Sequence, residues 1–152
     1  MTQNEIAQII TGFIGSLGFA VLFNIRGIRL LVAALGGLIS WTLFLVLNHL
    51  GLNDAVNYFL VALTVSLYAE IMARVLKTPK TTFITTSLIP LIPGSSLYYT
   101  MAYAFSSNLE MFLEKAIYTL QLASALALGI IIATTFTRIV TEIKYKTQKQ
   151  KP

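Results

Sequence analysis

Long apolar stretches alternate with short polar connectors along the whole chain. A helix needs about 20 mostly apolar residues to cross a bilayer, so this pattern predicts membrane-spanning helices rather than a soluble fold. Five stretches are long enough, and the predicted spans are residues 5–24, 30–50, 55–76, 82–106 and 115–139. We therefore predict an all-α integral membrane protein with five transmembrane helices, organised as a single transmembrane domain over residues 1–152.

The polar segments around these spans carry their own signals. Asp54 follows the connector of residues 51–53 and is predicted to be the N-cap of the third span. The basic tail, residues 142–152, is predicted to contact solvent and anionic lipid. The first apolar stretch has no preceding basic region and no Ala-x-Ala site, so we expect it to remain in the mature protein.

The basic residues gather at one end of the predicted helices. Arg26 and Arg29 lie between the first two spans, and most other basic residues fall on the same side two and four spans later. These are Arg74, Lys77, Lys80, Arg138, Lys144, Lys146, Lys149 and Lys151, whereas Lys115 lies on the other side. Because cytoplasmic connectors carry an excess of Lys and Arg, we predict that the N-terminus is outside and the C-terminus is cytoplasmic.

The composition narrows the possible functions. Only 11% of the 152 residues are charged, where a soluble domain has roughly 25%. With no cysteine and a single histidine, His49, neither a metal site nor a cofactor is expected. No nucleophile–base set, P-loop or dinucleotide fingerprint is present, so enzyme activity is not expected. The net charge of +5 lies mainly in connectors and the tail, which does not indicate nucleic-acid binding.

Small residues recur four apart in three of the predicted spans. Such spacing lets membrane helices approach closely, so it predicts packing between spans of this chain or contact with an oligomeric partner. The residues concerned are Gly12 with Ser16, Ala33 with Gly37, Gly36 with Ser40, and Ala125 with Gly129 and Ala133.

The fourth predicted span is interrupted by Pro90, Pro93 and Gly94. A proline lacks an N–H group and clashes with the carbonyl four residues back, so we expect the carbonyls of Thr86 and Ile89 to be freed. Inside a bilayer, freed backbone groups are tolerated only where they face protein or a watery cavity. A discontinuous helix at a binding site is therefore predicted, and a kink repaired by nearby hydroxyl groups is the structural alternative.

A new half-helix is predicted to begin at Gly94 or Ser95, at mid-membrane, and to run to about Ser106. Its first N–H groups carry partial positive charge, which suits a carboxylate, while the freed carbonyls suit an ammonium group or a cation. A small carboxylate or an amino acid would match this arrangement. The predicted substrate-binding residues are Pro90, Pro93, Gly94, Ser95, Ser96 and Tyr99.

Polar side chains recur along this half-helix. Ser95, Tyr99 and Tyr103 are spaced four apart and are predicted to share one face that lines a hydrated path. Three further hydroxyl groups would broaden that face, those of Ser96, Thr100 and Ser106. The alternatives are that the hydroxyl groups bond their own backbone and that the tyrosines belong to an interfacial belt.

Glu70 is the carboxylate that lies clearly inside a predicted span. An ionisable residue there is costly and is a functional candidate, since it can bind and release a proton during transport. Arg74 follows four residues later, in the order that favours an ion pair on a helix. Glu70 and Arg74 are therefore predicted coupling or gating residues, and a structural ion pair at the interface is the alternative.

Several motifs together resemble the threonine/serine exporter family. They are Ala-Glu-Ile-Met-Ala-Arg at 69–74, Lys-Thr-Pro at 77–79, Ile-Pro-Leu-Ile-Pro-Gly-Ser at 89–95, and Gly36-Gly37 to Trp41. The resemblance is closer to the small C-terminal half of the family, which in some bacteria is a separate subunit of a split two-subunit form.

This resemblance implies an exporter of small carboxylate-bearing metabolites, driven by the proton motive force in a bacterial plasma membrane. Family members move threonine and serine, and the split form is associated with succinate. It also implies a larger partner subunit of the same family. Two alternatives stay open, a non-transporting membrane subunit that stabilises a larger protein and a homo-oligomeric channel. An odd number of spans would give a related tandem unit the opposite orientation, as in inverted-repeat transporters.

Overall fold

The computed structural model describes residues 3–149, with side chains placed over residues 3–143, and this part of the chain contains helices and no strand. The helices are α1 (Gln3–Leu22), α2 (Ile28–His49), α3 (Asp54–Val75), α4 (Lys80–Leu88), the short 3₁₀ helix η1 (Ile89–Leu91), α5 (Gly94–Phe105) and α6 (Leu109–Lys149). Four of them, α1, α2, α3 and α6, are long and apolar enough to cross a membrane. The all-α membrane class is therefore confirmed, while the count of five spans and the orientation stay predictions.

The first three helices match the first three predicted spans to within a few residues, but the predicted cap of α3 is wrong by one position. Asn53 is the N-cap, and its Oδ1 accepts a hydrogen bond of 3.0 Å from the N–H of Ala55. Asn53 has an extended backbone (φ −63°, ψ 142°), which turns its side chain back over the first helical turn, whereas Asp54 is already helical.

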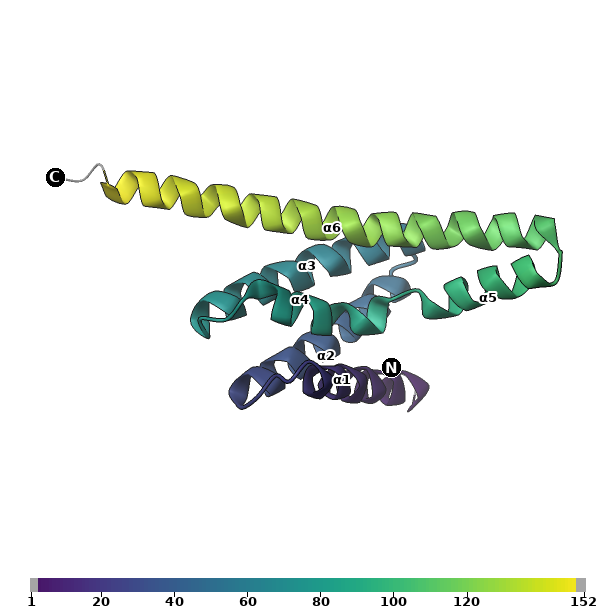
Figure 1. Ribbon diagram of the computed structural model, residues 1–152, viewed down its shortest axis with the longest axis horizontal. Coiled ribbons are helices and arrows are strands. Elements are labelled where there is room, and N and C mark those ends of the chain that lie inside the picture. The colour runs from purple at the N-terminus through teal and green to yellow at the C-terminus, as the bar shows by residue number, and fades with distance from the viewer. Residues whose placement is uncertain (1–2, 150–152) are drawn as a thin grey trace.

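Helices α1 to α4 form a bundle, and α6 lies along α3 (Figure 1). The Tyr118 hydroxyl donates to the Asp54 carboxylate at 2.5 Å, and Arg74 donates to Thr141 at 2.6 Å, so α3 and α6 run parallel. With 41 residues, α6 is about 60 Å long, roughly twice the thickness of a hydrocarbon core. Its predicted span, residues 115–139, is the part beside α3. The helix continues through tail residues 142–149, and residues 150–152 lie outside the described part.

The small-residue spacing marks contacts within the bundle. Ser16 of α1 lies against Gly37 of α2, so closely that a Cβ on Gly37 would overlap the serine. Ser87 of α4 occupies the equivalent place against Gly36. Gly129 packs with Ala125 and Ala133 on the buried face of α6, against α3. These stripes therefore pack helices of this chain together.

Gly129→Ala is expected to lower the free energy of unfolding by about 1–3 kcal/mol, the usual cost of overpacking a tight core. A Cβ here would lie 2.7 Å from the Phe59 carbonyl oxygen and 2.8 Å from the Ala62 Cβ, so α3 and α6 must separate. Thermal melting in detergent measures the effect. Gly18→Ala is the control, because its Cβ would meet nothing within 4 Å. Equal melting temperatures for the two variants would contradict this close contact.

The fourth predicted span is a broken helix, as its prolines predict. Helix α4 ends at Leu88, η1 follows, Ile92 is extended with ψ 123°, and α5 begins at Gly94. The expectation that Pro93 frees the carbonyl of Ile89 is wrong, because the Ile92 N–H donates to that oxygen at 3.2 Å. The tight 3₁₀ turn supplies this donor in place of the missing proline N–H.

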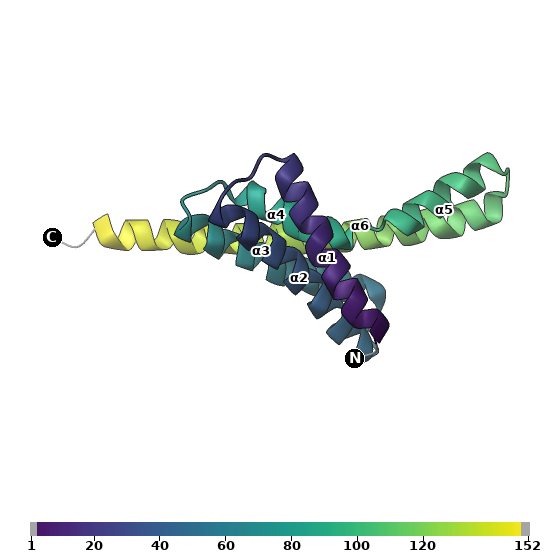
Figure 2. The same ribbon diagram turned by 90° about the horizontal axis from the view of Figure 1, so that it is seen from below.

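Beyond the break, α5 leaves the bundle and packs on the first part of α6, forming a hairpin that projects past the other helices (Figures 1 and 2). The Ser96 hydroxyl lies 2.6 Å from the Thr119 hydroxyl. Thr119 is next to Tyr118, which bonds Asp54 at the start of α3. Pro90, by contrast, lies beside Gly12 and Trp41, which are away from the ends of α1 and α2. The start of α5 is therefore level with the Asp54 end of α3 rather than half-way along it.

Candidate functional site

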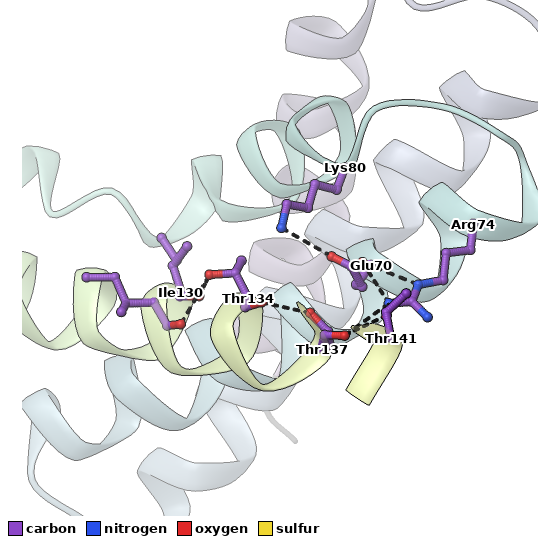
Figure 3. A network of polar contacts seen from close by, with 8 residues as sticks. Glu70, Arg74, Lys80, Ile130, Thr134, Thr137 and Thr141 are labelled. Atoms are coloured by element: carbon purple, nitrogen blue, oxygen red, sulfur yellow. Dashed lines mark hydrogen bonds and ion pairs between the residues drawn. The ribbon is translucent and has the colours of Figure 1, made fainter. Parts of the chain in front are cut away.

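Three charged side chains meet near the C-terminal end of α3, at the end of the bundle that holds the α1–α2 and α3–α4 connectors (Figure 3). We call this the basic end. Glu70 Oε1 accepts hydrogen bonds from Arg74 Nε at 3.3 Å and from Nη2 at 3.1 Å. Its other oxygen, Oε2, lies 3.5 Å from Lys80 Nζ. Only 16% of the Glu70 side chain is exposed, against 48% for Arg74 and 40% for Lys80. Because Lys80 opens α4, this carboxylate links α3 to the start of the broken helix.

Arg74 extends the same network to α6. Its Nη2 donates to Thr141 Oγ1 at 2.6 Å and to the Thr137 carbonyl oxygen at 3.4 Å. The Thr141 hydroxyl donates in turn to the Thr137 carbonyl at 2.7 Å (Figure 3). Glu70 and Arg74 of α3 therefore reach α4 through Lys80 and α6 through Thr141. This geometry fits a gating contact as well as a structural one.

A cavity of about 420 Å³ opens beside this network, within the size range of ligand pockets. It is lined by Glu70, Arg74, Lys80, Arg138, Thr141 and Glu142. Arg138 and Glu142 form their own exposed pair at 3.2 Å. The site thus offers three cationic groups and two carboxylates, which could bind an anion and take up a proton.

The sequence predicted Glu70 and Arg74, and the structure brings them together. The sequence did not predict the roles of Lys80 and Thr141. Lys80 reaches Glu70 because the α3–α4 connector folds back, and Thr141 reaches Arg74 because α6 lies along α3. The threonines at 134, 137 and 141 of α6 are three and four residues apart, so they share one face, and that spacing is the signal that would have pointed to them.

Pro90 lies at a second, smaller cavity of about 230 Å³. Gln8, Thr11 and Gly12 of α1 and Trp41 of α2 complete its lining. The Trp41 indole N–H donates to Gln8 Oε1 at 3.3 Å, and the Thr11 hydroxyl donates to the Gln8 carbonyl at 2.9 Å. Pro90 therefore faces a partly polar recess, and the amide of Gln8 inside an apolar stretch is the sequence signal that could have indicated it.

The residues of α5 divide between two faces. Ser96 and Thr100 are buried against α6, where both hydroxyl groups approach Thr119, at 2.6 and 3.3 Å. Ser95 and Tyr99 are exposed on another side of the helix. Ser96 and Thr100 therefore do not join the predicted polar face.

The start of α5 itself is open. A Cβ on Gly94 would meet nothing within 4 Å, and no side chain caps the helix at its N-cap, Pro93. The Gly94 N–H donates back to Ile92 and the Leu97 N–H to Pro93. Among the described residues, this leaves the Ser95 and Ser96 amides without a backbone acceptor.

His49 lies at the opposite end of the bundle. Its Nε2 is 3.2 Å from Glu5 Oε1, and its Nδ1 is 2.8 Å from the Leu45 carbonyl oxygen. Within residues 3–149, no three metal-ligating side chains of the His, Cys, Asp and Glu types come together. The histidine joins α1 to the end of α2.

Comparison with known proteins bears directly on this site. The family described as "Threonine/Serine exporter, ThrE" matches residues 8–136, which hold Glu70, Arg74, Lys80 and the whole of the broken helix. Neither a curated protein nor a solved structure gives a match. The match covers most of the chain and agrees with the motifs at 69–74 and 89–95, so the resemblance is confirmed. The chain is a membrane protein that belongs to the threonine/serine exporter family.

Proposed function

We propose that the chain is the membrane subunit of a secondary exporter of small carboxylate-bearing metabolites, either threonine and serine or a dicarboxylate such as succinate. It works in a bacterial plasma membrane, crosses it five times with the N-terminus outside, and is driven by the proton motive force. The observation that carries this proposal is the position of Glu70 between two cationic groups from two helices.

The coupling step follows from charge balance at Glu70. While Glu70 is ionised, it holds Arg74 and Lys80 in place. Ionised Glu70 can also pair with the ammonium group of threonine or serine in the adjoining cavity, where Arg74 and Lys80 face the substrate carboxylate. A proton taken up from outside neutralises Glu70 and releases the substrate there, and loss of that proton to the cytoplasm restores the site, so proton and substrate move in opposite directions. Because Lys80 begins α4, each exchange also loosens or tightens the first half of the broken helix.

In this proposal the second half of the broken helix offers a further carboxylate contact on the route, at the Asp54 end of α3 and so at the other end of the bundle from Glu70. The free amides of Ser95 and Ser96 carry the partial positive charge of the α5 N-terminus, which suits a carboxylate. Pro90 and Pro93 hold the chain out of helical form at this point, and the exposed Tyr99 shapes the path one turn further on. Discontinuous helices whose half-helix N-termini face anionic substrate groups occur in many secondary transporters.

A larger partner subunit completes the assembly. The hairpin of α5 and α6 projects past the other helices (Figure 2). The exposed apolar side chains include Leu97, Met101, Phe105, Leu113 and Ile117. Because the other helices do not reach this hairpin, its exposed apolar surface favours contact with a partner protein.

Reconstitution with and without a larger subunit of the same family tests the proposal. We expect the pair to catalyse counterflow of threonine, serine or succinate and this chain alone to give none above protein-free liposomes. Counterflow by the larger subunit alone would assign this chain a stabilising role. Uptake by this chain alone, independent of a proton gradient, would instead show a channel.

A further inference from the structure

A cavity of about 460 Å³ lies at the basic end, separate from the Glu70 network. Its polar lining comes from the α1–α2 connector and from the start of α4. Asn24, Arg26, Arg29, Thr78 and Thr82 supply these groups, and no carboxylate of the described residues lines the cavity. Two guanidinium groups without an acidic group in the same lining suit an anion, because each offers several N–H donors in a fixed plane.

The α1–α2 connector is shaped to present these arginines. Asn24 has a left-handed backbone with φ 57°, and Gly27 has φ 66°. The Arg26 Nε donates to Asn24 Oδ1 at 3.0 Å, which fixes the guanidinium while its other N–H groups stay available. Arg29 has no partner among the described residues. The connector therefore holds one arginine in place and leaves a second free to close on a ligand.

The N-terminus of α4 adds to the positive potential. Its N-cap is Pro79, which has no side chain able to cap the first N–H groups. These groups carry the partial positive charge of the helix end beside Thr78 and Thr82 of the cavity. The helix end and the two arginines converge from different segments, so the site does not rest on a helix terminus alone.

A smaller and mostly apolar groove of about 220 Å³ adjoins this cavity. Phe23, Ile25 and Thr82 line both, and Thr81 and Thr85 complete the groove. A charged cavity that continues into an apolar groove matches a molecule with a charged head and a hydrocarbon tail. A free phosphate or a small carboxylate would leave the groove unused.

We propose that this cavity binds the phosphate of an anionic phospholipid, with Arg26 and Arg29 on the phosphate and one acyl chain in the groove. Basic pockets between membrane helices bind lipid head groups in this way. The lipid would join the α1–α2 connector to α4 and so steady the first half of the broken helix. The site shares no lining residue with the cavity beside Glu70.

The test uses the purified chain in neutral detergent, titrated with phosphatidylglycerol or phosphatidylcholine and followed by native mass spectrometry. We expect one tightly bound phosphatidylglycerol and no comparable phosphatidylcholine. Arg26→Gln with Arg29→Gln should weaken binding by roughly tenfold or more, because charge-assisted hydrogen bonds are lost. Lys77→Gln with Arg138→Gln removes the same amount of charge outside the cavity. This variant should change the affinity for phosphatidylglycerol by less than about fivefold.

Two further measurements separate a lipid from a soluble anion and guard against misfolding. Thr85→Phe fills the groove and keeps both arginines, so it should weaken phosphatidylglycerol but not glycerol phosphate. Inorganic phosphate should displace the lipid only at far higher concentration. Equal binding of the two lipids, equal losses in the two double variants, or displacement by phosphate at lipid concentrations would each overturn the proposal.

Discussion

Glu70→Gln is expected to abolish proton-driven accumulation by the reconstituted pair while leaving exchange at equal concentrations. Glutamine keeps the size of the side chain and an oxygen acceptor for Arg74, but it has no charge and binds no proton. Without the coupling free energy between proton and substrate, typically about 1–3 kcal/mol, exchange only equalises the two substrate concentrations, so the accumulation ratio should fall to about 1. The pH dependence of exchange should flatten, since the titrating group of the proposed step is gone.

Glu142→Gln is the matched control for this experiment. Glu142 lines the same cavity and pairs with a cation, but 62% of its side chain is exposed and its partner, Arg138, lies on its own helix. Its loss should leave accumulation unchanged. If the Glu70 variant accumulates substrate with full pH dependence, Glu70 has no part in coupling and its contacts are structural.

Stability separates these two roles. Arg74 and Lys80 are each more than a third exposed, so solvent weakens their ion pairs with Glu70, and such pairs contribute about 0–1 kcal/mol. The Glu70 variant should therefore fold, and Arg74 keeps its bonds to α6. A large loss of transport with little change in melting temperature would indicate that Glu70 acts in transport. A large loss of transport together with a clearly lower melting temperature would indicate that Glu70 has a structural role.

The features that the sequence predicted are local ones. A proline breaks a helix within one turn of itself, so the interruption at Pro90 and Pro93 followed from the chain alone. The pairing of Glu70 with Arg74 needs only the four-residue spacing of a helix. Apolar length likewise located α1, α2 and α3, because a bilayer sets the same requirement wherever a helix lies in the fold.

The features that it did not predict depend on which segments meet. Hydropathy is nearly continuous from α4 into α5, so it does not indicate that α5 leaves the bundle to pack on α6. Lys80 reads as one more basic connector residue until the α3–α4 turn places it on Glu70. Asn53 and Asp54 are equally good caps by residue type, and the backbone angles decide between them.

Gly94→Leu is expected to preserve assembly and impair substrate binding. A side chain here meets open space, and Gly94 is not among the glycines with positive φ, so neither packing nor backbone geometry opposes the change. The leucine would cover the first turn of α5 and shield the Ser95 and Ser96 amides from a carboxylate. Loss of about 1.4 kcal/mol, within the range of helix-terminus effects, weakens binding about tenfold.

Counterflow by the reconstituted pair, measured over a range of substrate concentrations, gives this effect as a rise in KM, and size-exclusion chromatography checks assembly. Gly18→Leu makes the same chemical change at an exposed glycine of α1 that also has open space, so it should leave KM unchanged. A normal KM in the Gly94 variant would mean that the carboxylate does not bind at the start of α5. Substrate recognition would then have to lie with Arg74 and Lys80 at the basic end, because that cavity offers the other cationic groups of the proposed route.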